Sequence, residues 1–156
     1  MKKTAQALSA SVAEAGVTLA VAESLTGGQL SSTLAAAENA SDWFRGAVVA
    51  YASEVKFAVL GVTPGPVVTE QCAREMASGV CRLLGANVGV GITGVGGPGS
   101  TEGHPPGTVF AAVHTSARVV AREWHFDGEP EEVLEQAIRG TLGLVSVEVS
   151  ALIDHP

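Results

Sequence analysis

Apolar segments alternate with helical segments along the chain as far as Thr93, and this alternation restricts the fold more than any other feature. Apolar runs between helical segments are typical of parallel strands, because each connecting helix covers one face of the sheet. Two later apolar runs, GTVFAAVHT and ARVVAREWHF, predict a hairpin that turns around Ser116-Ala117. The pattern therefore predicts a three-layer α/β/α sandwich with a mostly parallel, mixed sheet.

The bounds of the elements follow from apolar periodicity and from residues that begin or end helices. Thr69 is expected to cap a long helix that Gly85 ends, and Pro130 is expected to begin the last helix. The segment around Asn39 and Asp42 is expected to be a loop. The other expected helices cover 4–15, 27–37 and 54–60, and the expected early strands cover 17–22, 46–52 and 86–93.

Composition limits the classes of partner. The length of 156 residues predicts one domain, 1–156. Because only 16% of the residues are charged, we expect this domain to bury further surface in a homo-oligomer. The net charge of −7, without a lysine or arginine cluster, argues against nucleic acid and membranes as partners. Residues 1–22 resemble an export signal, but Gln6, Ser9 and Glu14 interrupt the apolar stretch. No run approaches the roughly 18 apolar residues of a membrane span, so we expect a cytoplasmic protein.

Neither the cysteines nor the histidines show the spacing of a metal site. Cys72 and Cys81 are expected on opposite faces of one helix, because nine positions place them about half a helical turn out of phase. We therefore expect no disulfide, no metal and no cofactor. The histidines, none of which repeats at ligand spacing, are His104, His114, His125 and His155.

Two glycine patterns match a dinucleotide-binding fingerprint in their letters only. The GVGGPG that begins at Gly94 leads through Pro98 into a strand, whereas the fingerprint requires a helix N-terminus facing the pyrophosphate. The GVGITG that begins at Gly89 is better explained as a strand that another backbone approaches closely. The loop from Gly94 to Gly107 is either a flexible connection or a set of backbone N–H groups that cradles an anion.

The stretch AESLTGG, residues 22–28, places a carboxylate, two hydroxyls and two glycines between a strand and a helix. Glu23 and Thr26 act either as turn and cap residues or as part of a site. Ser24 lies where a helix dipole favours developing negative charge, as a nucleophile requires. Gly27 and Gly28 allow a ligand to approach the backbone closely.

The stretch SEVK, residues 53–56, matches the serine–lysine spacing SxxK, but its companion motifs SDN and KTG are absent. The plain interpretation is an exposed lysine after a helix-capping serine. However, Lys56 follows a buried strand near Tyr51, and a desolvated lysine is neutral near neutral pH and acts as a general base. Spacing leaves Ser53 and Ser24 both open as its partner.

Four stretches together resemble the C-terminal domain of the CinA family: LAVAESLTGG, FRGAVVAYASEVKFAVLGV, GITGVGGPGSTEGHPPGTVFAAV and the FDG before the last helix. They cover nearly the whole chain, without the larger N-terminal domain that many CinA proteins carry. The family includes stand-alone nicotinamide-nucleotide amidases of the PncC type. The resemblance implies an α/β/α fold, oligomers, and metal-independent hydrolysis of nicotinamide mononucleotide to nicotinate mononucleotide and ammonia.

The resemblance also implies roles for individual residues. Ser24 corresponds to the nucleophile, Lys56 to its base, and Tyr51 lies close by. The family commonly has asparagine at the position of Ser53, which makes the SxxK match coincidental. Backbone N–H groups around Thr93, Gly94 and Val95 are the expected oxyanion hole. The expected substrate-binding residues are Glu23, Thr26, Gly27, Gly28, Thr93, Gly94, Val95, Gly96 and Gly97.

The chain departs from the family pattern at several positions. Leu25 replaces a frequent cysteine, and His104 stands in a shortened glycine loop where lysine is common. The usual Gly-Asp-Arg before the last helix is Gly128-Glu129-Pro130, and the Val-Arg that follows is Val133-Leu134. We therefore expect a weak amidase. The alternative is a CinA-like domain that binds a nucleotide or a protein partner without turnover.

Overall fold

The computed structural model of the chain describes residues 2–154. Its five strands form one sheet in the order β2-β1-β3-β4-β5. β1 pairs in parallel with β2 and β3, whereas β4 pairs antiparallel with β3 and β5, which confirms the predicted mixed sheet and hairpin. The strands are β1 (Leu19–Glu23), β2 (Phe44–Val49), β3 (Val88–Gly94), β4 (Thr108–His114) and β5 (Val119–His125).

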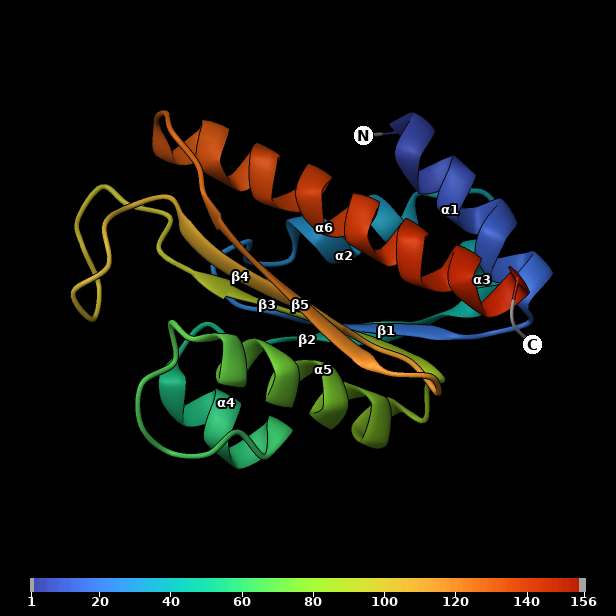
Figure 1. The fold of residues 1–156 in the computed structure, drawn as a ribbon, viewed down its shortest axis with the longest axis horizontal. Helices are drawn as coiled ribbons and strands as arrows, with labels where there is room; N and C mark the ends of the chain where they lie inside the picture. Colours follow the sequence, from blue (N-terminus) through green and yellow to red (C-terminus); the bar gives the residue numbers. More distant parts are fainter. Residues whose placement is uncertain (1, 155–156) are drawn as a thin grey trace.

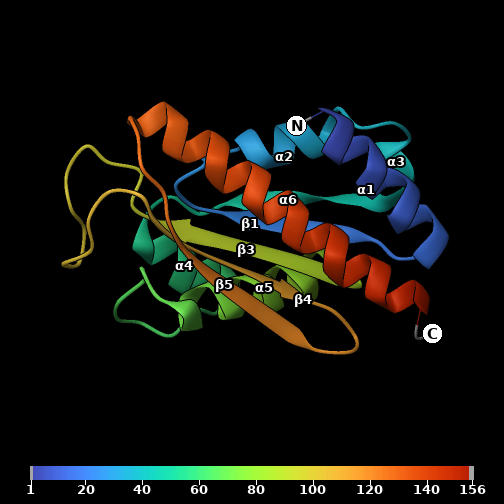
Figure 2. The same cartoon turned by 45° about the horizontal axis from the view of Figure 1, so that its top comes forward.

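Helices cover both faces of the sheet, as Figures 1 and 2 show. One face carries α1 (Lys2–Ala15), α2 (Gln29–Ala35), α3 (Ala40–Trp43) and α6 (Pro130–Asp154), and the other carries α4 (Ser53–Leu60) and α5 (Glu70–Leu84). The chain moves from β1 to β2 in one direction along the sheet and from β2 to β3 in the opposite direction. Because parallel crossovers are right-handed, the two connections lie on opposite faces. The result is the predicted three-layer fold.

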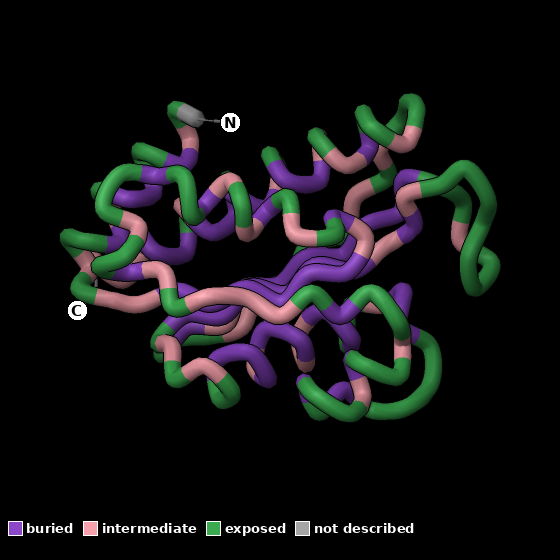
Figure 3. The backbone as a smooth tube through the Cα atoms, turned by 180° about the vertical axis from the view of Figure 1, so that it is seen from behind, coloured by how far each residue is buried: buried purple, intermediate pink, exposed green. Residues whose placement is uncertain are grey.

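The sheet forms the buried centre of the molecule (Figure 3). All residues of β1 are buried, as are all but the last residue of β3 and of β4. Glycines in β3 allow α5 to pack at very short range: a Cβ on Gly89 or Gly91 would lie 2.1 or 2.3 Å from a backbone oxygen of α5. This confirms that the glycines of GVGITG serve close backbone approach.

The caps predicted from local chemistry are present. The Thr69 hydroxyl accepts a hydrogen bond from Cys72 N at 3.0 Å, and Gly85 ends α5 in the left-handed conformation, with φ of 66°. Pro130 begins α6, as predicted. These three signals involve partners within a few residues, so the sequence alone is enough to read them.

Two segments differ from the prediction. A short helix, α3, lies in the predicted loop, because Trp43 is buried and its indole N–H donates to Ser9 Oγ at 3.2 Å. This contact spans 34 positions, and local composition does not reveal it. β2 ends at Val49 rather than at Ala52, since the chain leaves the sheet once Ala50 N has donated to Glu23 O.

One helix of the described residues, α6, is long and apolar enough to resemble a membrane span, although charged and polar residues interrupt its apolar stretch, as expected. Its 25 residues include an 18-residue window with a mean hydropathy of 1.2, which meets the length and composition of a span. In this fold, however, α6 lies across the sheet and packs against α1 and β4 (Figure 1). It is a core helix whose buried residues are Val133, Ala137, Ile138, Thr141, Leu142, Leu144, Val145, Glu148 and Val149.

Candidate active site

The carboxyl ends of β1, β2 and β3 meet at one edge of the sheet, and β1 lies between the other two. Ser24 N donates to Ile92 O at 3.1 Å, and Ala50 N donates to Glu23 O at 2.8 Å, which holds the three strand ends together. Open α/β sheets place ligands at such an edge, where connections depart in opposite directions. Ser24, the first residue after β1, lies at this switch point.

A pocket of about 290 Å³ opens at the same edge. It brings together residues that are far apart in the sequence. Of the predicted site residues, those that line it are Ser24, Tyr51, Lys56, Thr93, Gly94, Val95, Gly96 and Gly97. Ser53 lines it as well, so both candidate serines lie in the pocket that contains Lys56.

Lys56 lies on the buried side of α4, with 1% of its surface exposed. Its Nζ donates to the carbonyl oxygen of Tyr51 at 3.2 Å, while the Tyr51 side chain itself is 72% exposed. The interpretation of Lys56 as an exposed lysine after a cap is wrong on both counts, because Ala52 rather than Ser53 takes the N-cap position.

Burial lowers the pKa of Lys56, because the protein interior disfavours the charged form. Three groups oppose this effect: Cys72, Glu102 and Glu54. Burial also raises the pKa of Cys72 to about 11, so its thiol is uncharged near neutral pH. The opposition that remains at that pH comes from the two carboxylates. The prediction of a buried lysine with a lowered pKa is confirmed.

The Ser24 hydroxyl and Lys56 face the same pocket without being bonded to each other. Ser24 is 7% exposed, and within residues 2–154 no hydrogen bond joins its Oγ to Lys56 Nζ. Catalytic hydrogen bonds are often long until substrate is bound, so this geometry keeps the pair as a candidate nucleophile and base.

Glu23 is fully buried at the end of β1, and its carboxylate accepts hydrogen bonds from N–H groups at the start of α2. It accepts hydrogen bonds from the backbone N–H groups of Gly28, Leu30 and Ser31, at 3.2, 3.0 and 2.7 Å. It also accepts from the hydroxyls of Thr26 and Ser31. A carboxylate at a helix N-terminus satisfies donors that have no partner within the helix and interacts favourably with the helix dipole.

The predicted contact of this turn with substrate has no support in the geometry. Glu23 and Thr26 are 0% exposed, and neither they nor Gly27 and Gly28 line the pocket. The two glycines adopt left-handed conformations, with φ of 57° and 104°, which permit the tight turn before α2. The capping interpretation of Glu23 and Thr26 is therefore the one that the structure supports.

The loop from Gly94 to Gly107 is held at its base and in its middle, although it projects from the body of the molecule (Figure 3). Val95 N donates to Thr108 O and Gly107 N to Val95 O, each at 2.8 Å. The Val95 N–H is thus already used, which excludes it as an oxyanion donor. Within the described chain, the N–H groups of Gly96 and Gly97 have no protein acceptor, which makes them new candidates for this role.

Sequence reasoning missed Glu102, which ties this loop to the segment before α5. Its carboxylate accepts hydrogen bonds from Val67 N and Val68 N at 2.8 to 3.1 Å, and both valines line the pocket. Glu102 has a φ of 53°, an unusual value for a residue other than glycine. A lone carboxylate within a loop of glycine and proline was the available signal, but its partners lie 34 and 35 positions away.

The pocket also includes the start of α6, through Pro130 and Leu134. The resemblance described above predicts a departure from the family pattern at both positions. Across residues 2–154 there is no group of three or more metal-ligating side chains, and Cys72 and Cys81 are both free and buried. His155 lies outside the described residues.

Fold and site together define an α/β domain that places a serine and a buried lysine at the switch point of its sheet. The profile of the CinA C-terminal domain matches residues 1–149. The chain belongs to this family, as the sequence motifs predicted.

Individual relatives agree with this assignment. A protein of Bacillus subtilis (strain 168), named as a competence-damage inducible protein, is 41% identical over 126 residues, 78% of this chain and 30% of the relative. One of the same name from Desulforamulus reducens is 38% identical over 146 residues, 90% of this chain and 36% of the relative. The chain therefore spans about a third of the length of these curated relatives.

Solved structures show the same fold. A CinA superfamily protein from Escherichia coli is 35% identical, with a TM-score of 0.90 over 94% of this chain and 89% of that chain. A CinA superfamily protein from Klebsiella pneumoniae 700603 is 29% identical, with a TM-score of 0.92 over 96% of this chain and 98% of that chain. The three-layer fold is thus that of the family.

Proposed function

We propose that the chain is an amidohydrolase that converts nicotinamide mononucleotide to nicotinate mononucleotide and ammonia by a serine–lysine mechanism. The observation that supports it most is the burial of Lys56 in the pocket that Ser24 also lines. In the described part of the chain Lys56 forms no ion pair. Burying an unpaired cation is unfavourable, and such groups are found chiefly where their altered pKa is used.

In the proposed reaction, neutral Lys56 accepts the proton of the Ser24 hydroxyl as Oγ attacks the carboxamide carbon. The N–H groups of Gly96 and Gly97 stabilise the resulting oxyanion. The C–N bond then breaks, and Lys56 returns the proton to the departing ammonia, which leaves an ester on Ser24. Water, activated by Lys56, cleaves this ester to give the carboxylate and restores the serine.

Ammonia release from nicotinamide mononucleotide by the purified chain tests the proposal, with Ser24→Ala as the control. Rapid quenching during turnover adds a second measurement, because the ester on Ser24 increases the mass of the peptide that contains it. The absence of ammonia release from the unmodified chain contradicts the proposal.

The alternative, a domain that binds a nucleotide or a protein partner without turnover, is favoured by one observation. Pro130 and Leu134 line the pocket where the family pattern has arginine, so the site offers fewer donors to an anionic substrate. Tight nucleotide binding without ammonia release supports this alternative.

The proposal includes a cytoplasmic homo-oligomer as the functional form. Four of the large exposed apolar side chains lie within one short segment, namely Val49, Tyr51, Val55 and Val59. Exposed apolar groups that gather in this way favour association with another surface. Size-exclusion chromatography with light scattering measures the mass of the protein in solution. A monomer at all concentrations contradicts self-association.

A further inference from the structure

Lys56 is the only basic residue among the described residues that line the pocket. The chain contains nine lysines and arginines, and the other eight lie elsewhere. Lys2 and Lys3 belong to α1, and Arg82 lies against Gly61. The remaining arginines pair with Leu84 O (Arg45), Val119 O (Arg74), Glu148 (Arg118), Ala121 O (Arg122) and Glu135 (Arg139).

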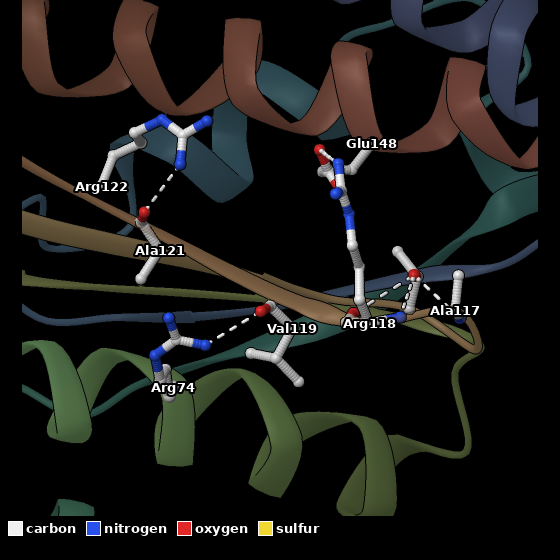
Figure 4. Close-up of polar contacts among 8 residues, drawn as sticks. Arg74, Ala117, Arg118, Val119, Ala121, Arg122 and Glu148 are labelled. Atoms are coloured by element: carbon white, nitrogen blue, oxygen red, sulfur yellow. Dashed lines mark hydrogen bonds and ion pairs between the residues drawn. The ribbon is translucent and has the colours of Figure 1, made fainter.

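Figure 4 shows three of these arginines: Arg118 and Arg122 on β5 and its hairpin, and Arg74 on α5 facing β5. Arg118 binds the buried carboxylate of Glu148 through two nitrogens, at 2.9 and 3.0 Å. Arg74 and Arg122 donate to backbone carbonyls of β5. Arginine and lysine are the side chains that proteins use most to hold a phosphate, and this chain uses its arginines to secure its own structure.

At two places near the pocket, backbone N–H groups already donate to carboxylates of the chain itself. The N–H groups of Val67 and Val68 donate to Glu102. At the start of α6, Glu129 N donates to the Glu132 carboxylate at 3.0 Å. Exposed backbone donors and helix N-termini are the usual sites for phosphate, so both places have an occupant of the same charge.

Carboxylates also lie near the pocket: Glu102 and Glu54 act electrostatically on Lys56, and other acidic residues are neighbours in sequence of residues that line it. Glu54 follows Ser53, Glu102 follows Thr101, and Glu129 and Glu131 flank Pro130, where Ser53, Thr101 and Pro130 all line the pocket. Carboxylates around a cleft repel anionic ligands and attract cationic ones, and the only charged residue of the described chain that lines this pocket, Lys56, has a lowered pKa.

We propose that this site selects the unphosphorylated pyridinium nucleoside, nicotinamide riboside, over the mononucleotide. The N-glycosylated ring carries one positive charge, which the carboxylates near the pocket attract. A phosphate monoester adds about 1.5 to 2 negative charges near neutral pH and reverses the sign of the net charge. The inference rests on the proposed amidase function for its kinetic test, whereas its binding test is independent of turnover.

The kinetic experiment compares ammonia release from nicotinamide riboside and from nicotinamide mononucleotide by the unmodified chain. We expect kcat/KM to be at least roughly tenfold higher for the riboside, which corresponds to about 1.4 kcal/mol of interaction free energy. Added salt should lower kcat/KM for the riboside and raise it for the mononucleotide, since screening weakens both attraction and repulsion.

A charge-reversal pair locates the effect. Glu131→Lys, next to Pro130, should reduce the preference for the riboside severalfold. Glu14→Lys makes the same charge change on α1, outside the pocket, and should leave the preference unchanged. An equal effect of both variants overturns the assignment to the carboxylates near the pocket.

Binding to Ser24→Ala separates a failure of the inference from a failure of the proposed function. Calorimetric titration with each ligand should show tighter binding of the riboside. If neither ligand is hydrolysed but this order holds, the amidase proposal fails and the charge selectivity stands. Equal or tighter binding of the mononucleotide, or no binding of either, overturns the inference.

Discussion

Lys56 donates its hydrogen bond to the carbonyl oxygen of Tyr51, at 3.2 Å, in a pocket that it shares with Ser24 and Ser53. This contact fixes the end of a buried lysine without giving it a counter-ion. Lys56 is thereby held as a group that can exchange a proton, and the first predictions concern that proton.

Replacing Ser24 by alanine should abolish amidase activity and leave the fold intact. The Ser24 hydroxyl makes no hydrogen bond within the described chain, so its loss should alter the free energy of unfolding by less than about 1 kcal/mol. Ser53→Ala is the matched control and should keep most of the activity. Ammonia release and thermal unfolding check both variants, and the reverse pattern would identify Ser53 as the nucleophile.

Lys56→Arg should be inactive, because a guanidinium does not give up its proton at any accessible pH. In the unmodified chain, kcat/KM should rise with pH through the pKa of Lys56, and that rise should lie below the ordinary value of 10.5. A pH profile of ammonia release measures it. Substantial turnover by Lys56→Arg would exclude Lys56 as the base.

The same pKa predicts how stability depends on pH. The folded chain holds Lys56 with a lowered pKa, so between that pKa and 10.5 the unfolded chain binds more protons. The free energy of unfolding therefore rises with pH in this window. The free energy of unfolding of Lys56→Met, measured with denaturant, should lack this rise. Lys3→Met, at an exposed position of α1, should retain it. Parallel pH profiles for the unmodified chain and Lys56→Met would contradict the prediction.

Glu102→Gln should shift the acidic limb of the kcat/KM profile to lower pH. Removing its charge takes away one of the groups that raise the pKa of Lys56, the others being Cys72 and Glu54. Glu54→Gln removes one negative charge but leaves the hydrogen bonds of Glu102 to Val67 and Val68 in place. It should produce a smaller shift in the same direction. Glu102→Gln should also weaken substrate binding, seen as a higher KM, because the loop loses part of its anchor.

Glu23→Ala should destabilise the fold by roughly 2–4 kcal/mol, since it leaves several buried donors without an acceptor. The donors are the three backbone N–H groups at the start of α2 and the hydroxyls of Thr26 and Ser31. Glu38→Ala, at an exposed position, is the control and should lie within about 0.5 kcal/mol of the unmodified chain. Urea unfolding measures both. A small effect at Glu23 would mean that α2 begins without this cap.

Pro130→Arg should raise kcat/KM for nicotinamide mononucleotide by at least roughly tenfold, or about 1.4 kcal/mol of transition-state stabilisation. Residue 130 lines the pocket, and an arginine there supplies a bidentate donor for phosphate. Ala13→Arg on α1 adds the same charge outside the pocket and should have no such effect. Activity of the unmodified chain equal to that of relatives with the arginine would contradict this prediction.

Sequence reasoning succeeded where the deciding contacts are local. Thr69, Gly85 and Pro130 act on residues within a few positions, and the alternation of segments determines the layers. It failed where the partners are distant. The hydrogen bond from the Trp43 indole to Ser9 helps to hold α3, and Glu102 accepts hydrogen bonds from the backbone of Val67 and Val68; both contacts span more than 30 positions.

The site shows the same division. The burial of Lys56 followed from its place after a strand, and the family resemblance selected Ser24 over Ser53. The sequence left two roles possible for Glu23, a helix cap or a contact with substrate, because its spacing suits both. Only the structure shows that its carboxylate points to the N-terminus of α2. The Val95 N–H was assigned to the oxyanion although β4 already uses it, since no pattern in the sequence shows which strand edge is paired.

The close contact between α5 and β3 has a consequence for how this pocket can change over evolutionary time. Gly91 has no room for even one methyl group, because a Cβ there would lie 2.3 Å from Ala73 O. α5 is therefore seated against the sheet at a fixed depth, and Val67 and Val68 just before it form part of the pocket wall. New specificity cannot come from enlarging side chains behind that wall. The glycine loop and the first turn of α6 also line the pocket and are not seated against α5 in this way, so changes of side chain there meet less resistance.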